Sequence, residues 1–271
     1  MPETTQSYAL KLAYDGARFH GFAKQKDAHI ATVQGALEEA LATVLRLDSP
    51  LKTVCAGRTD AGVHALGQVV SFELPGEPLD AQARGSLVRS LNALTPESMS
   101  VRWLQAAKPG FSARFDAQSR EYHYHLYNHP VPPVFTKDFA WHYPQLLDKF
   151  VMKQSIILLQ GQHDFRSFCT AASALPGKNT LRTIHTFELF EHDIMGEDIL
   201  TLRIIGNAFL HSQVRIMVGT VCEIAAGKRE YSDLADILAA KNRAAAGITA
   251  PAHGLTLRQV IYPEKAIIED C

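Results

Sequence analysis

The 271-residue chain has few cysteines and no long apolar run. Its four cysteines, at positions 55, 169, 222 and 271, lie far apart without a C-x-x-C pair, which argues against zinc knuckles and against a disulfide framework. No apolar run approaches the roughly 20 residues that a membrane-spanning helix needs. The start, Met1–Thr5, lacks the basic and apolar regions of a signal peptide, so we expect a cytoplasmic protein.

The chain also lacks an excess of charge of either sign, because 27 Lys and Arg stand against 28 Asp and Glu. Nucleic-acid binding needs cations that meet phosphates, and this balance alone does not favour it. Five of the acids lie within residues 188–198, a segment without Lys or Arg. The remaining sequence therefore has a modest basic excess, which permits a basic RNA-binding cleft.

What the sequence does contain is typical of a globular protein, with 46% hydrophobic and 20% charged residues and room for one large domain or two modest ones. In the first half, periodicity predicts the order strand, helix, strand, strand, helix, strand. These elements are expected at 8–14, 32–45, 52–56, 68–74, 80–94 and 99–106. Thr32 and Asp80 are the predicted N-caps of the two helices, and Leu87, Leu91 and Leu94 are expected on one side of the second.

The second half repeats this order. Strands are predicted at 119–128, near 182–191 and 199–205 with the acids at their turn, and at 255–262, and helices near 145–160, 211–226 and 232–240. Tyr122, Tyr124 and Leu126 share one face of the first of these strands. Two consecutive split β-α-β units fit this order, so we expect an α+β fold with mostly antiparallel sheets and helices on one face. The expected halves are residues 1–110 and 111–271, with a cleft between them.

The segment Gly57–Ala65, GRTDAGVHA, joins two predicted strands and carries the clearest chemistry. Its glycines let the backbone turn sharply and let another molecule approach closely. The guanidinium of Arg58, two residues before Asp60, favours an ionised carboxylate that is available as nucleophile or base. From residue types and spacing alone, a surface turn with a local Arg–Asp pair is the commoner explanation.

The longer string that continues to Gln68 closely resembles the signature of the tRNA pseudouridine synthases of the TruA type. Further segments that resemble the family extend over most of the chain, at 14–21, 32–35, 163–168, 208–219 and 250–255. Two positions depart from the family pattern. Phe22-Ala23 stands where the family usually has Trp-Gln, and Gln213 stands where Met is usual before Val-Arg.

The resemblance implies an isomerase that converts uridine to pseudouridine at positions 38, 39 and 40 of the tRNA anticodon stem-loop. It implies that Asp60 is the catalytic nucleophile, that Tyr122 covers the target uracil, that Arg58 helps the nucleotide to leave the stack, and that Arg215 pairs with Asp60. It also implies a homodimer in which one tRNA touches both subunits. The isomerisation transfers no electron and adds no group, so no cofactor and no metal is expected.

Residue types alone leave plainer explanations open. Arg215 could equally lie at the edge of the apolar helix face with its guanidinium in water. Tyr122 could equally be a strand tyrosine that packs in the core. Two other functions also fit parts of the sequence. His123 and His125, with His163-Asp164, would suit a metal-dependent hydrolase, although no H-E-x-x-H motif is present. A non-catalytic RNA-binding module would leave the Asp60 segment unexplained.

Overall fold

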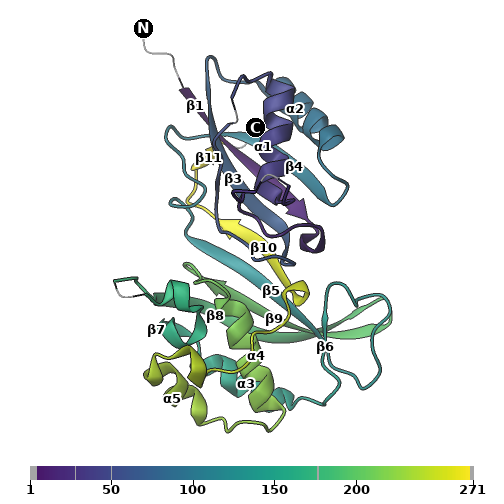
Figure 1. The fold of residues 1–271 in the computed structure, drawn as a ribbon, viewed down its shortest axis with the longest axis vertical. Helices are drawn as coiled ribbons and strands as arrows, with labels where there is room; N and C mark the ends of the chain where they lie inside the picture. Colours follow the sequence, from purple (N-terminus) through teal and green to yellow (C-terminus); the bar gives the residue numbers. More distant parts are fainter. Residues whose placement is uncertain (1–4, 28, 50, 176, 269–271) are drawn as a thin grey trace. The chain divides into compact units, whose positions relative to one another are not determined.

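The computed structural model describes residues 5–27, 29–49, 51–175 and 177–268 (Figure 1). Contacts within the chain group it into two compact units, Met1–Gln118 with Leu257–Cys271, and Ser119–Thr256. Both units combine helices with a mostly antiparallel sheet, which confirms the predicted α+β class. The division into domains at residues 110 and 111 stays a prediction, and residues 111–118 group with the first unit.

The sheet of the first unit is built around β1 (Thr5–Tyr14), which pairs antiparallel with β3 (His64–Pro75) on one side and β4 (Met99–Ala107) on the other. The order is β11-β4-β1-β3-β10, with β2 also paired to β3. The remaining bounds are β2 Val54–Cys55, β10 Leu255–Ile261 and β11 Ile267–Ile268. The order β4-β1-β3-β2 is that of a split β-α-β unit, as the sequence predicts.

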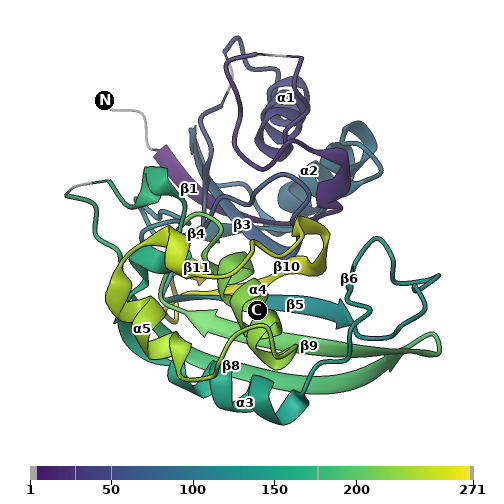
Figure 2. The same ribbon diagram turned by 60° about the horizontal axis from the view of Figure 1, so that its bottom comes forward.

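Helices α1 (Val33–Leu45) and α2 (Ala81–Leu94) pack against each other over this sheet (Figures 1 and 2). Both predicted caps are confirmed, because Thr32 Oγ1 accepts from Gly35 N at 3.2 Å and Asp80 Oδ1 from Ala83 N at 2.7 Å. Leu87 and Leu91 of α2 are buried, whereas Leu94, which ends the helix, is 52% exposed.

The first unit buries apolar side chains on both faces of its sheet. Leu10 and Leu12 of β1 are fully buried, as are Leu37 and Leu41 of α1. Successive strand residues point to opposite faces, so Ala9 belongs to a second cluster. That cluster also contains Ala56, Val69, Ala107, Phe111, Ala113 and Ala266. Segments that follow β4 and β10 therefore cover the other face and hold the strands between two apolar layers.

The second unit has the strand order β5-β9-β8-β7, with antiparallel pairs throughout, and the short β6 runs parallel to β5. The bounds are β5 Ser119–Tyr127, β6 Trp141–His142, β7 Gly161–Asp164, β8 Leu181–Ile194 and β9 Glu197–Gly206. Three α-helices follow or separate these strands, α3 Lys149–Leu158, α4 Gln213–Ala225 and α5 Asp233–Ala240. Helix α4 packs against α3, which also contacts β8, and nearly all residues of α4 are buried.

Several expected boundaries were wrong. The strand expected at 52–56 is only Val54–Cys55, whereas β3 starts within the motif at His64. The hairpin β8–β9 runs to a two-residue turn at Met195-Gly196, so the acids of 188–198 lie mostly in the strands. Strands β6, β7 and β11 were not predicted. Among the described residues, no helix is long and apolar enough to cross a bilayer.

Candidate active site

The loop between β2 and β3 presents Asp60. Arg58 is exposed, Thr59 is buried and Asp60 is half-buried. Val63 N donates to Asp60 O at 3.2 Å, which closes a tight turn, and Gly62 adopts a φ of +80° that few other residues tolerate. The loop thus directs its polar side chains outward while Thr59 anchors it to the interior.

Tyr14, at the end of β1, holds the buried side of this loop. Its hydroxyl lies 2.8 Å from Thr59 Oγ1, and Gln68 Nε2 approaches the same hydroxyl at 3.4 Å and donates to Gly57 O at 2.7 Å. Burial raises the pKa of Tyr14 above its usual value, so the hydroxyl keeps its proton at neutral pH. The hydroxyl accepts from Gln68 and shares a hydrogen bond with Thr59 in which either oxygen can be the donor.

A second support comes from the chain that follows β1. A Cβ at Gly16 would lie 2.1 Å from Val63 O, so only glycine fits against the turn. Gly16 N donates to Nδ1 of the buried His64 at 3.1 Å. Farther along, Phe22 N donates to Thr59 O at 3.1 Å. Phe22, where the sequence departs from the family, is buried against Tyr14, with ring centroids 6.3 Å apart. Phe22 therefore lies behind the loop, whereas Ala23 is half-buried.

Sequence reasoning did not identify these supports. Tyr14 and Gly16 fall within a segment that resembles the family, but no local pattern shows that they hold a loop more than 40 residues away. The signal that was available is the pairing of β1 with β3, which brings Tyr14 opposite Ala65. Strand pairing of this kind is set by the fold and not by local spacing.

Tyr122 lies on β5 opposite Ile204 of β9, on the predicted face of the strand. Its ring is 7% exposed and contacts Phe209 edge to face, with centroids 5.2 Å apart at 86°. Tyr124, two residues on, is fully buried and donates its hydroxyl to Pro251 O at 2.8 Å. Burial raises the pKa of Tyr124 well above its usual value. Of the two tyrosines, Tyr122 is thus the one that keeps some exposed surface.

Arg215 lies in α4 and is half-buried. Its Nε donates to Ala250 O at 2.8 Å, and Ala250 N donates to Arg215 O at 3.1 Å. A Cβ at Gly219 would lie 2.1 Å from Ile248 O, so α4 packs directly against this segment. The guanidinium is therefore held by the protein at its Nε edge, which limits the directions in which its terminal nitrogens can point.

Gln213, the second departure from the family pattern, begins α4 and is 1% exposed. Its Oε1 accepts from Leu210 N at 2.9 Å, while its own N donates to Leu210 O at 3.1 Å. The two bonds close a turn between Leu210 and the first residue of the helix. Gln213 therefore stabilises the start of the helix that carries Arg215.

The structure brings Arg58 and Asp60 together on one loop of the first unit and places Tyr122 and Arg215 on separate elements of the second. The predicted pairing of Arg215 with Asp60 and the predicted cleft between the halves stay predictions.

The histidines of the hydrolase hypothesis bind other groups. His123 Nε2 lies 2.8 Å from Glu121 Oε1, His125 Nδ1 2.8 Å from Thr201 Oγ1, and His163 Nε2 2.7 Å from Gln160 O. No cluster of three or more His, Cys, Asp or Glu that could hold a metal occurs among the described residues.

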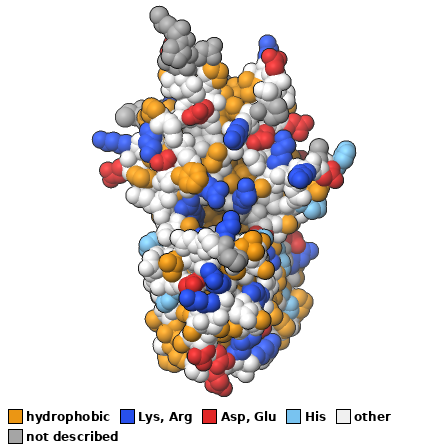
Figure 3. All heavy atoms as spheres, turned by 60° about the vertical axis from the view of Figure 1, so that its left-hand side comes forward, with side chains coloured by type: hydrophobic (Ala, Val, Ile, Leu, Met, Phe, Trp, Pro, Cys, Tyr) orange, Lys and Arg blue, Asp and Glu red, His pale blue; other side chains and the backbone are white. Residues whose placement is uncertain are grey.

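Surface charge is unevenly spread. On the face drawn in Figure 3, Lys and Arg side chains are interspersed with Asp and Glu side chains, and a further group of acidic side chains lies at the lower end. The net charge of −1 thus averages over basic and acidic side chains. A basic surface is what contact with phosphates requires.

Comparison with known proteins decides the family. A family model described as tRNA pseudouridine synthase matches residues 11–116 and 156–263. The chain belongs to the tRNA pseudouridine synthases. Proteins named tRNA pseudouridine synthase A are similar over nearly their whole length. The one from Bacillus licheniformis is 40% identical over 93% of this chain and 97% of its own. Those from Geobacillus kaustophilus and Brevibacillus brevis are 39% and 42% identical, over 97% and 93% of this chain and 97% of each relative. This synthase is therefore an enzyme that isomerises uridine in tRNA.

Proposed function

We propose that this synthase acts on uridines 38, 39 and 40 of the tRNA anticodon stem-loop in the cytoplasm, with Asp60 as the nucleophile. The observation that supports Asp60 is the way its loop is built. Tyr14, Gly16 and Phe22 fix the loop from the interior, while the carboxylate and the Arg58 guanidinium remain at the surface. Rigid support of an accessible carboxylate is what nucleophilic catalysis requires.

The reaction breaks the glycosidic C–N bond, turns the uracil and joins its C5 to the ribose, after which C5 loses a proton. The Asp60 carboxylate acts as the nucleophile in the first steps. Tyr122 covers the uracil, and its hydroxyl is suited to pass on the C5 proton. Arg215 orients the carboxylate, and Arg58 holds the nucleotide out of the stack. Burial raises the pKa of Cys55, near the same loop, to about 11, so its thiol does not compete as a nucleophile.

The segment that follows Gly16 supports tRNA binding beside Asp60. Its exposed side chains include Arg18, His20, Lys24 and Lys26, with one exposed acid, Asp27. The hydrogen bond from Phe22 N to Thr59 O ties this segment to the Asp60 loop. Cations placed at that loop would meet the phosphates next to the target nucleotide.

Replacement of Asp60 by Asn tests the nucleophile. The amide has the same shape but no basic carboxylate, so we expect tRNA binding to persist and pseudouridine formation to stop. The control is Asp80→Asn, because Asn caps a helix as well as Asp does. Pseudouridine would be mapped in tRNA after reaction with each purified variant, and in tRNA from a strain that lacks the protein. Substantial product from Asp60→Asn would overturn the assignment, and unchanged modification at positions 38–40 in the deletion strain would overturn the target.

We also propose that the synthase works as a homodimer that binds one tRNA across both subunits, as the family resemblance suggests. Sedimentation of the protein with and without tRNA tests this. A complex with one subunit and one tRNA that retains full activity would contradict it.

A further inference from the structure

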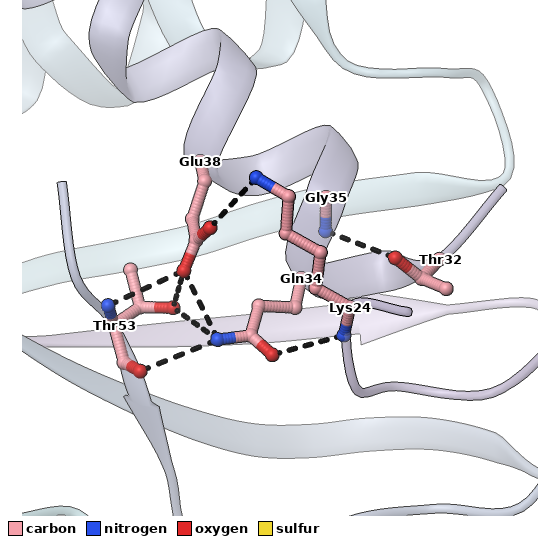
Figure 4. Close-up of polar contacts among 6 residues, drawn as sticks. All are labelled: Lys24, Thr32, Gln34, Gly35, Glu38 and Thr53. Atoms are coloured by element: carbon pink, nitrogen blue, oxygen red, sulfur yellow. Dashed lines mark hydrogen bonds and ion pairs between the residues drawn. The ribbon is translucent and has the colours of Figure 1, made fainter. Parts of the chain in front are cut away.

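A buried carboxylate on α1 lies outside the chemistry described above. Glu38 is 6% exposed, and its carboxylate makes four polar contacts, which Figure 4 shows. Its Oε1 accepts from Thr53 N at 3.4 Å, from Thr53 Oγ1 at 2.9 Å and from Gln34 Nε2 at 3.0 Å. Its Oε2 lies 3.4 Å from Lys24 Nζ. A buried carboxylate is costly unless such partners satisfy it, so this network is a fixed feature of the fold.

Gln34, one helical turn before Glu38, extends the network to the main chain. Its Oε1 accepts from Lys24 N at 3.1 Å, and its own N donates to Phe22 O at 2.9 Å. Its Nε2 also reaches Thr53 Oγ1 at 3.3 Å and Thr53 O at 3.4 Å. Lys24 is thus held at its backbone by Gln34 and at its ammonium by Glu38.

Two routes lead from this network to the Asp60 loop. In the first, Gln34 fixes Phe22, whose N donates to Thr59 O at 3.1 Å. In the second, Glu38 fixes Thr53, which directly precedes β2 and the loop that follows it. Two residues on the N-terminal side of Asp60, Thr53 and Thr59, are therefore connected to the network around one carboxylate of α1.

We propose that Glu38 is a positioning residue for catalysis, which sets the Asp60 loop through Gln34, Phe22 and Thr53. The inference rests on the proposed role of Asp60. It also accounts for the short β2, because Thr53 directs its N–H and hydroxyl to Glu38 and not to a neighbouring strand. A displacement of about 1 Å at a catalytic group is enough to lower a rate by two orders of magnitude.

Glu38→Gln is the informative variant. It keeps the shape of the side chain, but its NH2 group would face either the donors of Thr53 and Gln34 or the ammonium of Lys24, so donors would meet donors. We expect the single-turnover rate at saturating tRNA to fall at least about tenfold, while the Kd for tRNA changes less than about threefold. The matched control is Glu39→Gln, an exposed neighbour on the same helix, which should leave both unchanged.

A second pair of variants separates positioning from general loss of stability. Thr53→Ser keeps the hydroxyl that Glu38 binds and should keep the wild-type rate. Thr53→Val removes that hydroxyl and should behave like Glu38→Gln. Hydrogen exchange at Phe22 N gives a measurement independent of activity, and we expect faster exchange in Glu38→Gln than in Glu39→Gln.

A normal rate in Glu38→Gln, or weaker tRNA binding with an unchanged rate, would overturn the positioning role. Failure of the proposed function would look different, because Asp60→Asn would then remain active or the wild type would form no pseudouridine. In that case unchanged exchange at Phe22 N would still refute the link from Glu38 to the loop, and faster exchange would support it.

Discussion

The hydroxyl groups of Tyr14 and Thr59 lie 2.8 Å apart in the interior of the first unit, directly behind Asp60. Thr59 precedes Asp60 in the chain, so any movement of Thr59 is passed to the carboxylate. Gln68 completes the arrangement by contacting both Tyr14 and the carbonyl of Gly57. Side chains from two paired strands therefore fix a loop whose outer residues carry the chemistry.

Tyr14→Phe should impair catalysis more than it impairs folding. The change removes one hydroxyl and leaves Thr59 without that partner, at a cost to stability of about 1–2 kcal/mol for a buried group. We expect kcat to fall severalfold while the KM for tRNA changes little. The control is Tyr8→Phe on the same strand, because the Tyr8 hydroxyl accepts from Leu79 N at 2.8 Å and does not touch the loop. Equal losses of kcat in both variants would show that only stability matters.

Substitutions of Tyr122 should separate stacking from proton transfer. Tyr122→Phe keeps a ring against Phe209, so tRNA should bind nearly normally and react slowly, whereas Tyr122→Leu should also weaken binding of the flipped base. Base–aromatic stacking contributes roughly 1–3 kcal/mol per base. Tyr124→Phe is the control, because that hydroxyl binds only a backbone carbonyl. Near-normal rates in both Tyr122 variants would make Tyr122 a core residue without a catalytic role.

Arg215→Ala should remove most of the activity, and Arg215→Lys should recover little. Arg215 Nε donates to Ala250 O, and a guanidinium can keep that contact while it makes a two-pronged contact with a carboxylate. An ammonium group cannot make both contacts in that geometry. Single-turnover rates at saturating tRNA would measure the effect, which we expect to be about a hundredfold or more, as for other groups that orient a reacting side chain.

Arg229→Ala is the matched control for Arg215, because Arg229 also donates to a backbone carbonyl of the second unit, Ala245 O at 3.0 Å. It should keep normal turnover at temperatures where both variants are folded. A fully active Arg215→Ala would refute the catalytic role, and a structure with the guanidinium far from Asp60 would refute the pairing.

The order of elements could be predicted because the signals for it are local. Thr32 and Asp80 precede runs with helical spacing, and the structure shows both side chains accepting the expected N–H groups. Alternation along β5 placed Tyr122, Tyr124 and Leu126 on one face, and each is less than 10% exposed. Cys222, on the apolar stripe of α4, is fully buried.

The missed elements have physical reasons. A strand of two residues such as β6 or β11 contains too few residues for an alternating pattern. At the β8–β9 turn, Met195 and Gly196 adopt φ values of +56° and +85°, the type I′ geometry that lets a hairpin close over two residues. The acids nearby were therefore expected in a longer turn than the one that forms.

The residues of the candidate site also differ in whether the sequence suggests them. Asp60 and Arg58 were identified because the motif is continuous in sequence. Glu38 was not, because its partners Lys24, Gln34 and Thr53 come together only when α1 packs against the segments on either side of it. Residues that support a site from a distance leave no local pattern, so sequence reasoning proposes candidate catalytic groups sooner than their supports.

Glu197, the first residue of β9, fixes the loop that follows β5. Its carboxylate accepts from the backbone N–H groups of Val134, Phe135 and Thr136 at 2.6, 3.0 and 2.9 Å, and from Thr136 Oγ1 at 2.6 Å. Burial alone would raise the pKa of Glu197, but the hydrogen bonds from Thr136 and the three backbone groups outweigh it and lower the pKa to about 2.

The lowered pKa of Glu197 predicts how the stability of the fold changes with pH. A carboxyl whose pKa in the folded state lies below the ordinary value of 4.5 stabilises the fold above pH 4.5, and loses that effect as the pH falls toward 2. Glu197→Gln should therefore lower the Tm at neutral pH, and the difference from the wild type should shrink below pH 4.5. Thermal unfolding measured at several pH values checks this, with the exposed neighbour Asp198→Asn as control. A Tm difference that stays constant down to the acid limit of the folded protein would contradict the role of the ionised carboxylate.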